Sequence, residues 1–393
     1  MNDRLSSTIE DLIQRIEALA PTLAARASET EQRRAPLPET VAAFRAAGLL
    51  RVFVPRRYGG LALGWRAPYV LGRAIARHCP SSTWLVSIVG PHAAYTGRFP
   101  VAAQDEVWAE GPDIVIAAAT VSRGGRLTRD RDGVRVAGHF GFASAVDHAS
   151  WALIIGATES GEAISCLLPR RDFSIEDDWY AAGLRGTGTK TIVADAWVPA
   201  HRIVSSRILI GPRPPGSVQN PEPMYAREYT PFVAGVLLGP MLGATEAGID
   251  AYVTTTRARV GALFGNRPAE MTTVQERLAE STAEFRAAEL LADAVMNHLL
   301  AREADGGSIS PERQLEFGRD RSFAMKLCTG AMQRLTQQMG ALGLFDDNPV
   351  QRFARDVAAM ATHFGVGWDR NMVAFGRALL NPGDVQEHPF WKT

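Results

Sequence analysis

Hydrophobic side chains recur at helical spacing at both ends of the chain. Near the N-terminus they fall on one helical face, at Leu5, Ile9, Leu12, Ile16, Leu19 and Leu23, and this spacing predicts a helix over 5–31. The same periodicity, with Pro or Ser near the starts, predicts shorter helices over 38–48, 67–78 and 83–89. Ser81 or Ser82 is expected to cap the last of these. Residues 1–111 are therefore predicted to form a helical domain.

The pattern changes at Pro112, where helical spacing gives way to short runs rich in apolar and β-branched residues. Turns such as Arg131-Asp132-Gly133 separate these runs. The runs that predict strands are Asp113–Thr120, Val134–Gly138, Trp151–Ala157, Ala163–Pro169 and Thr191–Val198. Residues 112–210 are predicted to form a β-domain, a barrel or sandwich of roughly five to eight strands at usual strand lengths.

Helical spacing returns after a Pro-rich loop over 212–223. Long helices are predicted over 232–261, 271–304, 311–341 and 349–380. Ser310-Pro311 and Asn348-Pro349 supply an N-cap residue and a first-turn proline for the last two. Residues 225–393 are predicted to form a four-helix bundle, which gives an α+β fold in the order helical, β, helical.

Composition removes several classes of function. The chain has 393 residues, and its 42 basic side chains balance 42 acidic ones, so bulk charge gives no support for binding nucleic acid or an anionic membrane. Cys79, Cys166 and Cys328 are too widely spaced for a disulfide framework or a zinc site, and no metal is expected. No apolar run approaches the ~18 residues of a membrane span, and the N-terminus is unlike a signal peptide. A cytoplasmic protein is expected.

The candidate binding chemistry centres on the stretch Trp179–Arg202. Its glycines and the polar side chains between them are Gly183, Arg185, Gly186, Thr187, Gly188 and Thr189. Glycine allows a positive φ and a close approach to a planar ligand, while hydroxyls and a guanidinium can hydrogen-bond that ligand. A Gly-rich turn in an ordinary sheet would have the same composition. The stretch therefore indicates a planar ligand only in combination with other motifs.

Further motifs occur in order along the chain: SIVGPHAAYTGRFP, FASAVDHASWALI, GLRGTGTKT and NPVQRFARD…THFGVGWD. Together with the helical, β, helical order, they resemble the acyl-CoA dehydrogenase superfamily over nearly the whole chain. Within it the chain is most similar to the oxygenase components of two-component flavin-dependent monooxygenases (group D). The resemblance implies reduced FMN from a separate NAD(P)H-dependent reductase, with FAD as the alternative, and O2 to form a C4a-hydroperoxyflavin. It also implies a homotetramer, because flavin sites in this fold borrow residues from a partner subunit.

The last predicted helix distinguishes the two reactions of the superfamily. A thioester dehydrogenase needs a glutamate as base, which in the family follows an Arg-Asp pair by about two turns. Here Arg355-Asp356 is followed by His363-Phe364, and the next carboxylate is Asp369. An oxygenase instead needs neutral hydrogen-bonding groups and exclusion of water. Hydroxylation of a small aromatic, phenolic or polyketide-like substrate is predicted. The alternatives are N-oxygenation of an amine or amino sugar, acyl-CoA dehydrogenation, and a non-enzymatic flavin-binding role.

The resemblance places His92, Ser144 and His363 around the flavin as catalytic residues. It implies that His363 assists formation or protonation of the hydroperoxide, that Ser144 bonds the flavin near N5, and that His92 orients or deprotonates a phenol. As isolated residues, each would ordinarily be a packing or capping residue. Phe142 and Trp368 are expected beside His92 at the substrate. The loops 205–230 and 381–393 are expected to set selectivity.

The other cofactor residues that the resemblance implies fall into two groups. Arg185, Thr187 and Thr189 join Ser144 at the flavin ring. The second group would reach the flavin phosphates or tail from a neighbouring subunit, and consists of Arg257, Arg259, Phe264, Gln337 and Gly340. Loose spacing around Phe264 favours FMN over FAD. For Arg257 and Arg259 a solvated helix face is an equal alternative.

Overall fold

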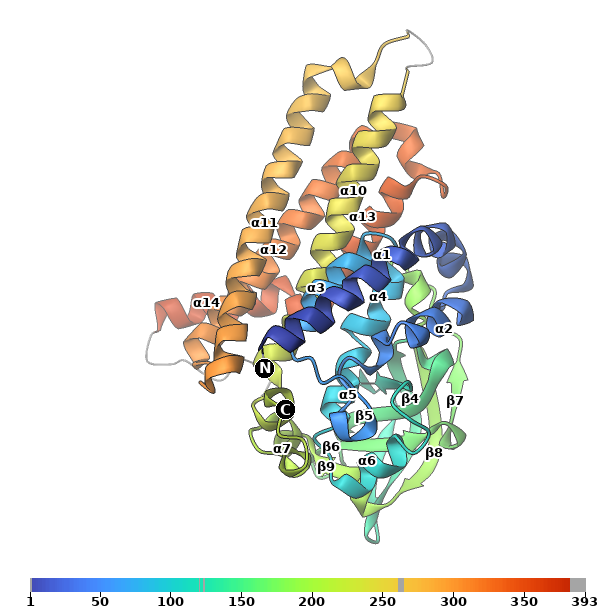
Figure 1. Ribbon diagram of the computed structural model, residues 1–393, viewed down its shortest axis with the longest axis vertical. Helices are drawn as coiled ribbons and strands as arrows, with labels where there is room; N and C mark the ends of the chain where they lie inside the picture. Colours follow the sequence, from blue (N-terminus) through green and yellow to red (C-terminus); the bar gives the residue numbers. More distant parts are fainter. Residues whose placement is uncertain (1, 120, 123, 261–264, 382–393) are drawn as a thin grey trace.

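The computed structural model describes residues 2–119, 121–122, 124–260 and 265–381. It has a helical layer, a β-domain and an elongated helical bundle in the order that the hydrophobic pattern predicts (Figure 1). The predicted α+β fold is confirmed.

The N-terminal helices form a layer that adjoins both the bundle and the β-domain (Figure 1). They are α1 (Asn2–Arg33), α2 (Pro38–Ala46), α3 (Arg66–Ala76), α4 (Pro80–Ser87), α5 (Gly90–Thr96) and α6 (Val101–Val107). Helix α4 begins at Pro80 with Cys79 as its N-cap residue, so the expectation that Ser81 or Ser82 caps it is wrong. Proline suits the first helical position because it has no N–H to leave unsatisfied.

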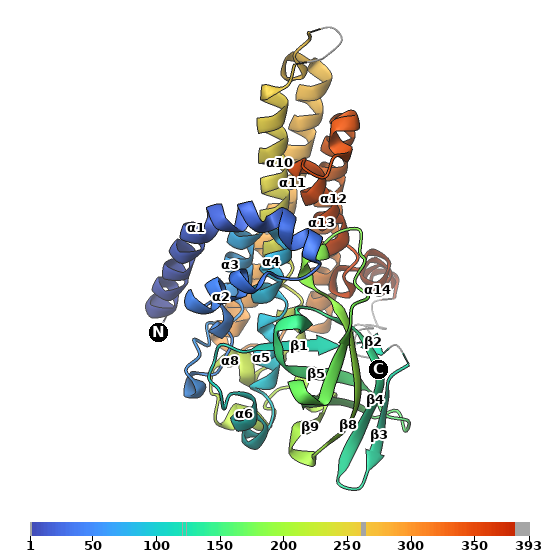
Figure 2. The same ribbon diagram turned by 90° about the vertical axis from the view of Figure 1, so that its right-hand side faces the viewer.

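The described residues of the β-domain form two sheets (Figure 2). The first has the order β1-β5-β6-β9, in which β1 and β5 are parallel and the other pairs antiparallel. The second has the order β2-β4-β8-β7, with β3 beside β4. The strands are β1 (Val115–Ala119), β2 (Val121–Ser122), β3 (Arg126–Asp130), β4 (Gly133–Ala143), β5 (Ala149–Ala157), β6 (Ala163–Pro169), β7 (Phe173–Glu176), β8 (Lys190–Val198) and β9 (Ile203–Ser205). The strands absent from the prediction are short or mostly exposed, and such strands carry little hydrophobic alternation.

Three short helices lead from the β-domain to the bundle: α7 (Ser206–Ile210), α8 (Pro223–Ala226) and α9 (Thr230–Val233). The bundle then comprises α10 (Leu238–Ala258), α11 (Thr272–Asp305), α12 (Pro311–Gln338) and α13 (Pro349–Met360), and α14 (Trp368–Leu380) packs against α12. The segment Thr230–Ala258 has the length and apolar composition of a membrane span, but 78% of its most apolar window is buried inside the protein. This segment, which contains α9 and α10, therefore belongs to the core of the fold.

The single helix predicted over 349–380 is wrong, because the chain breaks between α13 and α14. A short 3-10 turn, η10 (Phe364–Val366), occupies the break, and His363 stands at its N-cap position. Gly365 lies within this turn and Gly367 follows it, and glycine is a poor helix former. The expected caps of α12 and α13 are confirmed: the Ser310 hydroxyl accepts from the Arg313 N–H at 3.3 Å, and the Asn348 side chain accepts from the Val350 N–H at 3.0 Å.

Candidate functional site

The Gly-rich stretch is held in an unusual backbone conformation between three elements. The 3-10 turn η5 (Arg185–Thr187) contacts α1 and α4. Leu184 and Gly188, on either side of it, have φ values of +51° and +58°. For leucine this left-handed conformation is strained, and such strain persists where the surroundings fix it and is common at functional sites.

Helix α13 fixes the start of this turn. The Leu184 N–H donates to Asp356 Oδ1 at 2.6 Å, and a Cβ added to Gly183 would lie 2.1 Å from the Arg355 carbonyl oxygen. Burial raises the pKa of Asp356 to about 7. Asp356 was not among the predicted site residues, because nothing in its sequence neighbourhood distinguishes a carboxylate that binds a distant peptide N–H.

The end of β4 approaches the same turn and is also strained. Pairing of β4 with β8 is irregular between Phe140 and Ala143, and Phe142 and Ala145 have φ values of +64° and +56°. The Ala145 N–H donates to the Thr187 carbonyl oxygen at 2.9 Å. This bond places Ser144 directly beside the Gly-rich turn.

Three buried hydroxyls form a chain at this junction. Ser144 Oγ lies 2.8 Å from Thr189 Oγ1, which lies 2.6 Å from Thr187 Oγ1. Thr187 Oγ1 donates to the Leu184 carbonyl oxygen at 2.9 Å. Their residues are 5%, 8% and 1% exposed for Ser144, Thr189 and Thr187, so water has little access. The structure therefore brings together three of the four residues predicted at the flavin ring.

Arg185, the fourth, carries an unused donor. Its Nε is buried and has no hydrogen-bond partner among the described residues. A buried N–H without a partner is costly, so this atom fits a ligand that offers an acceptor. The isoalloxazine ring has acceptors along its pyrimidine edge and needs both donors and acceptors around it. Ser144 and Arg185 thus fit the flavin implied by the sequence.

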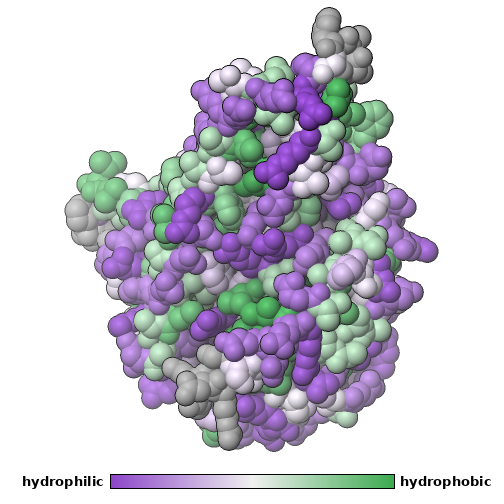
Figure 3. All heavy atoms as spheres, turned by 45° about the horizontal axis from the view of Figure 1, so that its top comes forward, coloured by the Kyte–Doolittle hydropathy of each residue, from purple (hydrophilic) through white to green (hydrophobic). Residues whose placement is uncertain are grey.

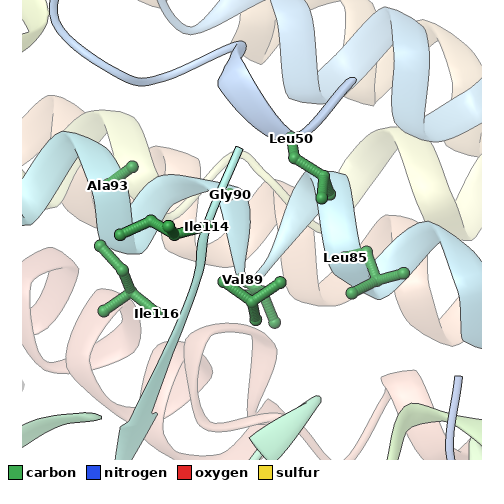
Figure 4. A pocket seen from close by; sticks show the side chains of 8 residues that line it. Leu50, Leu85, Val89, Gly90, Ala93, Ile114 and Ile116 are labelled. Atoms are coloured by element: carbon green, nitrogen blue, oxygen red, sulfur yellow. The ribbon is translucent and has the colours of Figure 1, made fainter. Parts of the chain in front are cut away.

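His92 has a defined tautomer. Its Nδ1 lies 2.7 Å from the Ile116 carbonyl oxygen, which can only accept, so Nδ1 carries the proton and Nε2 is an acceptor in the neutral ring. Burial lowers the pKa of His92 to about 4. The helix and strand that hold it enclose an apolar cavity of about 10 Å³ between Val89, Ala93 and Ile116 (Figure 4). That volume admits at most one water molecule, so the cavity is no substrate site.

His363 has the opposite tautomer. Its Nδ1 accepts from the Gly365 N–H at 3.2 Å, so the neutral ring carries its proton on Nε2 as a donor. The ring lies edge-on to Trp84 of α4, with centroids 6.4 Å apart, and burial lowers the pKa of His363 to about 4. His363 lies in the break after α13. The hydrophobic spacing had predicted that it would lie within a helix. Both histidines are therefore neutral near pH 7.

The two predicted substrate-side aromatics lie on different elements. Phe142 is 46% exposed and lies edge-on to Trp179, with ring centroids 6.5 Å apart. Trp368, at the start of α14, lies under the Lys326 ammonium at 4.2 Å and beside Phe323 of α12. Trp368 thus packs against α12, whereas Phe142 packs against Trp179 at the start of the Gly-rich stretch.

The second group of predicted cofactor residues lies at the far end of the bundle. Arg259, just after α10, donates to the Met339 carbonyl oxygen at 3.2 Å, beside the exposed Gln337 and Gly340. Phe264 lies outside the described residues. This end of α10 points away from the β-domain in both ribbon views (Figures 1 and 2). Within one chain, the structure does not bring the two groups together.

Comparison with known proteins defines the class. Residues 8–108 match the acyl-CoA dehydrogenase N-terminal domain, and residues 236–368 match the acyl-CoA dehydrogenase C-terminal domain. The chain is 31% identical to the flavin-dependent monooxygenase oxygenase subunit HsaA of Rhodococcus jostii, over 93% of this chain and 97% of that protein. It is 30% identical to the oxygenase component of the FADH(2)-dependent resorcinol hydroxylase of a Rhizobium species, over 94% of each chain. The solved structure of XiaF from a Streptomyces species, in complex with FADH2 and glycerol, superposes with a TM-score of 0.87 at 25% identity, covering 96% of this chain and 97% of that one.

The chain belongs to the acyl-CoA dehydrogenase superfamily, and within it to the oxygenase components of two-component flavin-dependent monooxygenases. It is a monooxygenase that depends on reduced flavin and acts on a small-molecule substrate with a separate reductase as its partner. The predicted superfamily, enzyme class and flavin dependence are confirmed.

Proposed function

We propose that this oxygenase hydroxylates a small phenolic substrate whose hydroxyl is held by His92 Nε2. The fixed tautomer of His92 carries the proposal. Because Nδ1 donates to the Ile116 carbonyl oxygen, Nε2 offers a lone pair to a substrate O–H. A hydrogen bond from the phenol to this nitrogen increases electron density in the ring at the carbon that receives oxygen. The resorcinol hydroxylase relative is named for a phenolic substrate, and the HsaA relative is named as a flavin-dependent monooxygenase.

The lowered pKa of His92 favours a phenol over an amine. An imidazole with a pKa of about 4 is a hydrogen-bond acceptor but a weak base near pH 7. It cannot remove the proton of an alkylammonium ion, whose pKa is about 10 as for lysine. A phenol donates a hydrogen bond without first losing its proton, so it needs no stronger base.

The other residues are proposed to hold the reduced flavin, which on reaction with O2 supplies the oxygen atom. Ser144 accepts a hydrogen bond from the ring, and the unpartnered Arg185 Nε donates to an acceptor on it. His363 presents Nε2–H to the same site, and its contact with Trp84 keeps water away. Phe142 lines the substrate side, while Trp368 is a weaker candidate for that role.

We also propose the identity of the flavin, the reductase, the location and the domain boundaries. We expect FMN as the flavin, an NAD(P)H-dependent reductase, a cytoplasmic location, and domains over 1–111, 112–210 and 225–393.

A homotetramer is supported by the separation of the two groups of predicted cofactor residues and by apolar side chains at the surface. Among these are Val373, Leu379 and Leu380 of α14, which are 57%, 65% and 83% exposed. Hydrophobic surface is visible on the projecting edge of the molecule where α14 lies (Figure 3). Large exposed apolar areas are typical of interaction sites.

Oxygen-18 labelling tests the proposed function. The oxygenase, a flavin reductase, NADH and FMN would be incubated under 18O2 with matched phenols, amines and thioethers. We expect one labelled oxygen on the phenolic ring, and loss of most product with His92→Asn while the affinity for reduced FMN is retained. Labelling of amines in preference to phenols would replace this proposal with N-oxygenation. Consumption of O2 without label in any organic product would contradict the hydroxylase proposal.

A further inference from the structure

The hydroxyl chain at the end of β4 has only one possible direction. The Leu184 carbonyl oxygen can only accept, so the single hydrogen of Thr187 Oγ1 is committed to it. Thr189 must then donate to Thr187 across their 2.6 Å contact, and Ser144 must donate to Thr189 across 2.8 Å. Every hydroxyl hydrogen in the chain is assigned.

Ser144 Oγ is consequently left with lone pairs and no hydrogen for a ligand. In the chain Ser144 is the donor to Thr189, and none of the described residues donates a hydrogen bond to Ser144 Oγ. An exposed serine rotates its hydroxyl to suit either a donor or an acceptor. Here burial and the fixed direction prevent such rotation, so a ligand that places a lone pair against Ser144 Oγ meets repulsion, and one that places an N–H there gains a bond.

Oxidised and reduced flavin differ in this respect. The N5 atom of the ring is a lone-pair acceptor when oxidised and an N–H donor when reduced. We propose that Thr187, acting through Thr189, holds Ser144 as an obligate acceptor and thereby makes the site select reduced flavin over oxidised flavin. The inference rests on the proposed contact of Ser144 with the flavin ring and adds a positioning residue that touches no ligand itself.

Such selection matters for an enzyme that receives its flavin from a separate reductase. Oxidised flavin is released again after each turnover and would compete for the site. A hydroxyl that accepts a hydrogen bond from the reduced ring and repels the oxidised ring favours the replacement of oxidised flavin by reduced flavin. Asp356 also helps to fix the direction of the hydroxyl chain. Its carboxylate accepts from the Leu184 N–H and so holds the backbone of Leu184, whose carbonyl oxygen sets that direction.

Anaerobic flavin titration tests the proposal without turnover. Dissociation constants for reduced and oxidised FMN would be measured for the wild type, Thr187→Val and the hydroxyl-retaining control Thr187→Ser, with thermal unfolding to verify the fold. Thr187→Val frees the Thr189 hydrogen to turn toward Ser144, whose own hydrogen can then meet the oxidised ring. We expect the preference for reduced FMN to fall about tenfold, as for one net hydrogen bond, and Thr187→Ser to retain it. An unchanged preference in Thr187→Val would overturn the inference.

A double-mutant cycle distinguishes an effect on the direction of the hydroxyl chain from general damage to the site. In a Ser144→Ala background there is no acceptor left to orient, so adding Thr187→Val should change the redox preference no further. A further loss in that background would show that Thr187 acts by another route, which overturns the proposal. If Thr187→Val does not fold, Thr189→Val interrupts the same chain and is held to the same outcomes. Failure of the wild type to bind flavin in either redox state would instead contradict the proposed function itself.

Discussion

The two groups of predicted cofactor residues occupy regions of opposite character. Apart from the half-buried Arg185 guanidinium, the side chains of Leu184–Thr189 are buried and neutral, and the hydroxyl hydrogens have defined partners. Around the end of α12 the surface is open: Leu344 and Phe345 are 82% and 59% exposed, and the Arg259 guanidinium donates to the Met339 carbonyl oxygen. The first region is complete within one chain. The second has exposed apolar and cationic groups, among them Leu344, Phe345 and Arg257.

This difference indicates which part of flavin binding a single chain can provide by itself. Selection of a neutral ring needs fixed donors and acceptors in a region that excludes water, and a single chain provides these. Recognition of a charged phosphate or of a second subunit needs accessible cations and apolar surface, which must stay exposed until the partner arrives.

The largest effect is expected from Gly183→Ala. The added Cβ would lie 2.1 Å from the Arg355 carbonyl oxygen, so α13 must move away from the Gly-rich turn, and the bond from Leu184 to Asp356 is lost with it. We expect a loss of about 2–3 kcal/mol in the free energy of unfolding and loss of measurable flavin binding. Gly376→Ala is the matched control, because a Cβ there meets nothing within 4 Å and alanine favours helix. Equal unfolding free energies for the two variants would contradict the docking role.

The second prediction concerns the tautomer of His92. His92→Asn keeps a donor for the Ile116 carbonyl oxygen but has no acceptor in place of Nε2. We expect kcat/KM for the phenol to fall about tenfold, as for the loss of one net hydrogen bond, with little change in the dissociation constant of reduced FMN. His148→Gln is the control, since His148 also bonds a backbone carbonyl oxygen, that of Pro36 at 2.7 Å, and has no proposed role at the substrate. A parallel loss in both variants would assign His92 to structure alone.

These residues also show how far the sequence could predict the molecule. Helices α1, α11 and α12 follow from hydrophobic spacing and caps, because these signals lie within each segment. The identities of Ser144, Thr187 and Thr189 follow from the resemblance of local motifs. The hydroxyl chain that joins these residues could not be predicted from the sequence. It depends on contact between the end of β4 and the Gly-rich turn, and Ser144 and Thr189 are 45 residues apart.

The hydrophobic pattern likewise could not predict the role of Asp356 or the break at His363. Asp356 bonds a peptide N–H 172 residues away, and only tertiary packing decides that contact. At His363 the apolar spacing continues through the break, so periodicity predicted one helix. The two glycines at 365 and 367 were the available signal against it. They place the imidazole at an N-cap, where its tautomer is set by a backbone N–H.

The third prediction uses the pH dependence of stability at Asp356. In the unfolded chain the carboxyl loses its proton near the ordinary pKa of 3.8, whereas burial holds the proton to about pH 7 in the folded protein. Between these values the folded state binds more protons, so this group destabilises the fold as pH rises. Wild type should therefore lose stability relative to Asp356→Asn as the pH rises from about 4 to 7. Urea unfolding of both proteins across that range measures the difference, and parallel pH profiles would contradict it.

The smallest expected signal, and the sharpest test of the comparison, is complementation between two defective proteins. Ser144→Ala damages the buried region, and Arg257→Ala with Arg259→Ala damages the exposed one. If each flavin site combines the first region of one subunit with the second region of another, hybrids of the two proteins contain some sites in which both regions are intact. Denaturing and refolding an equal mixture should restore about a quarter of wild-type activity, as random assembly of paired subunits gives. If both regions served a flavin from the same chain, no hybrid site would be intact, and the mixture would have only the mean activity of the two variants refolded alone.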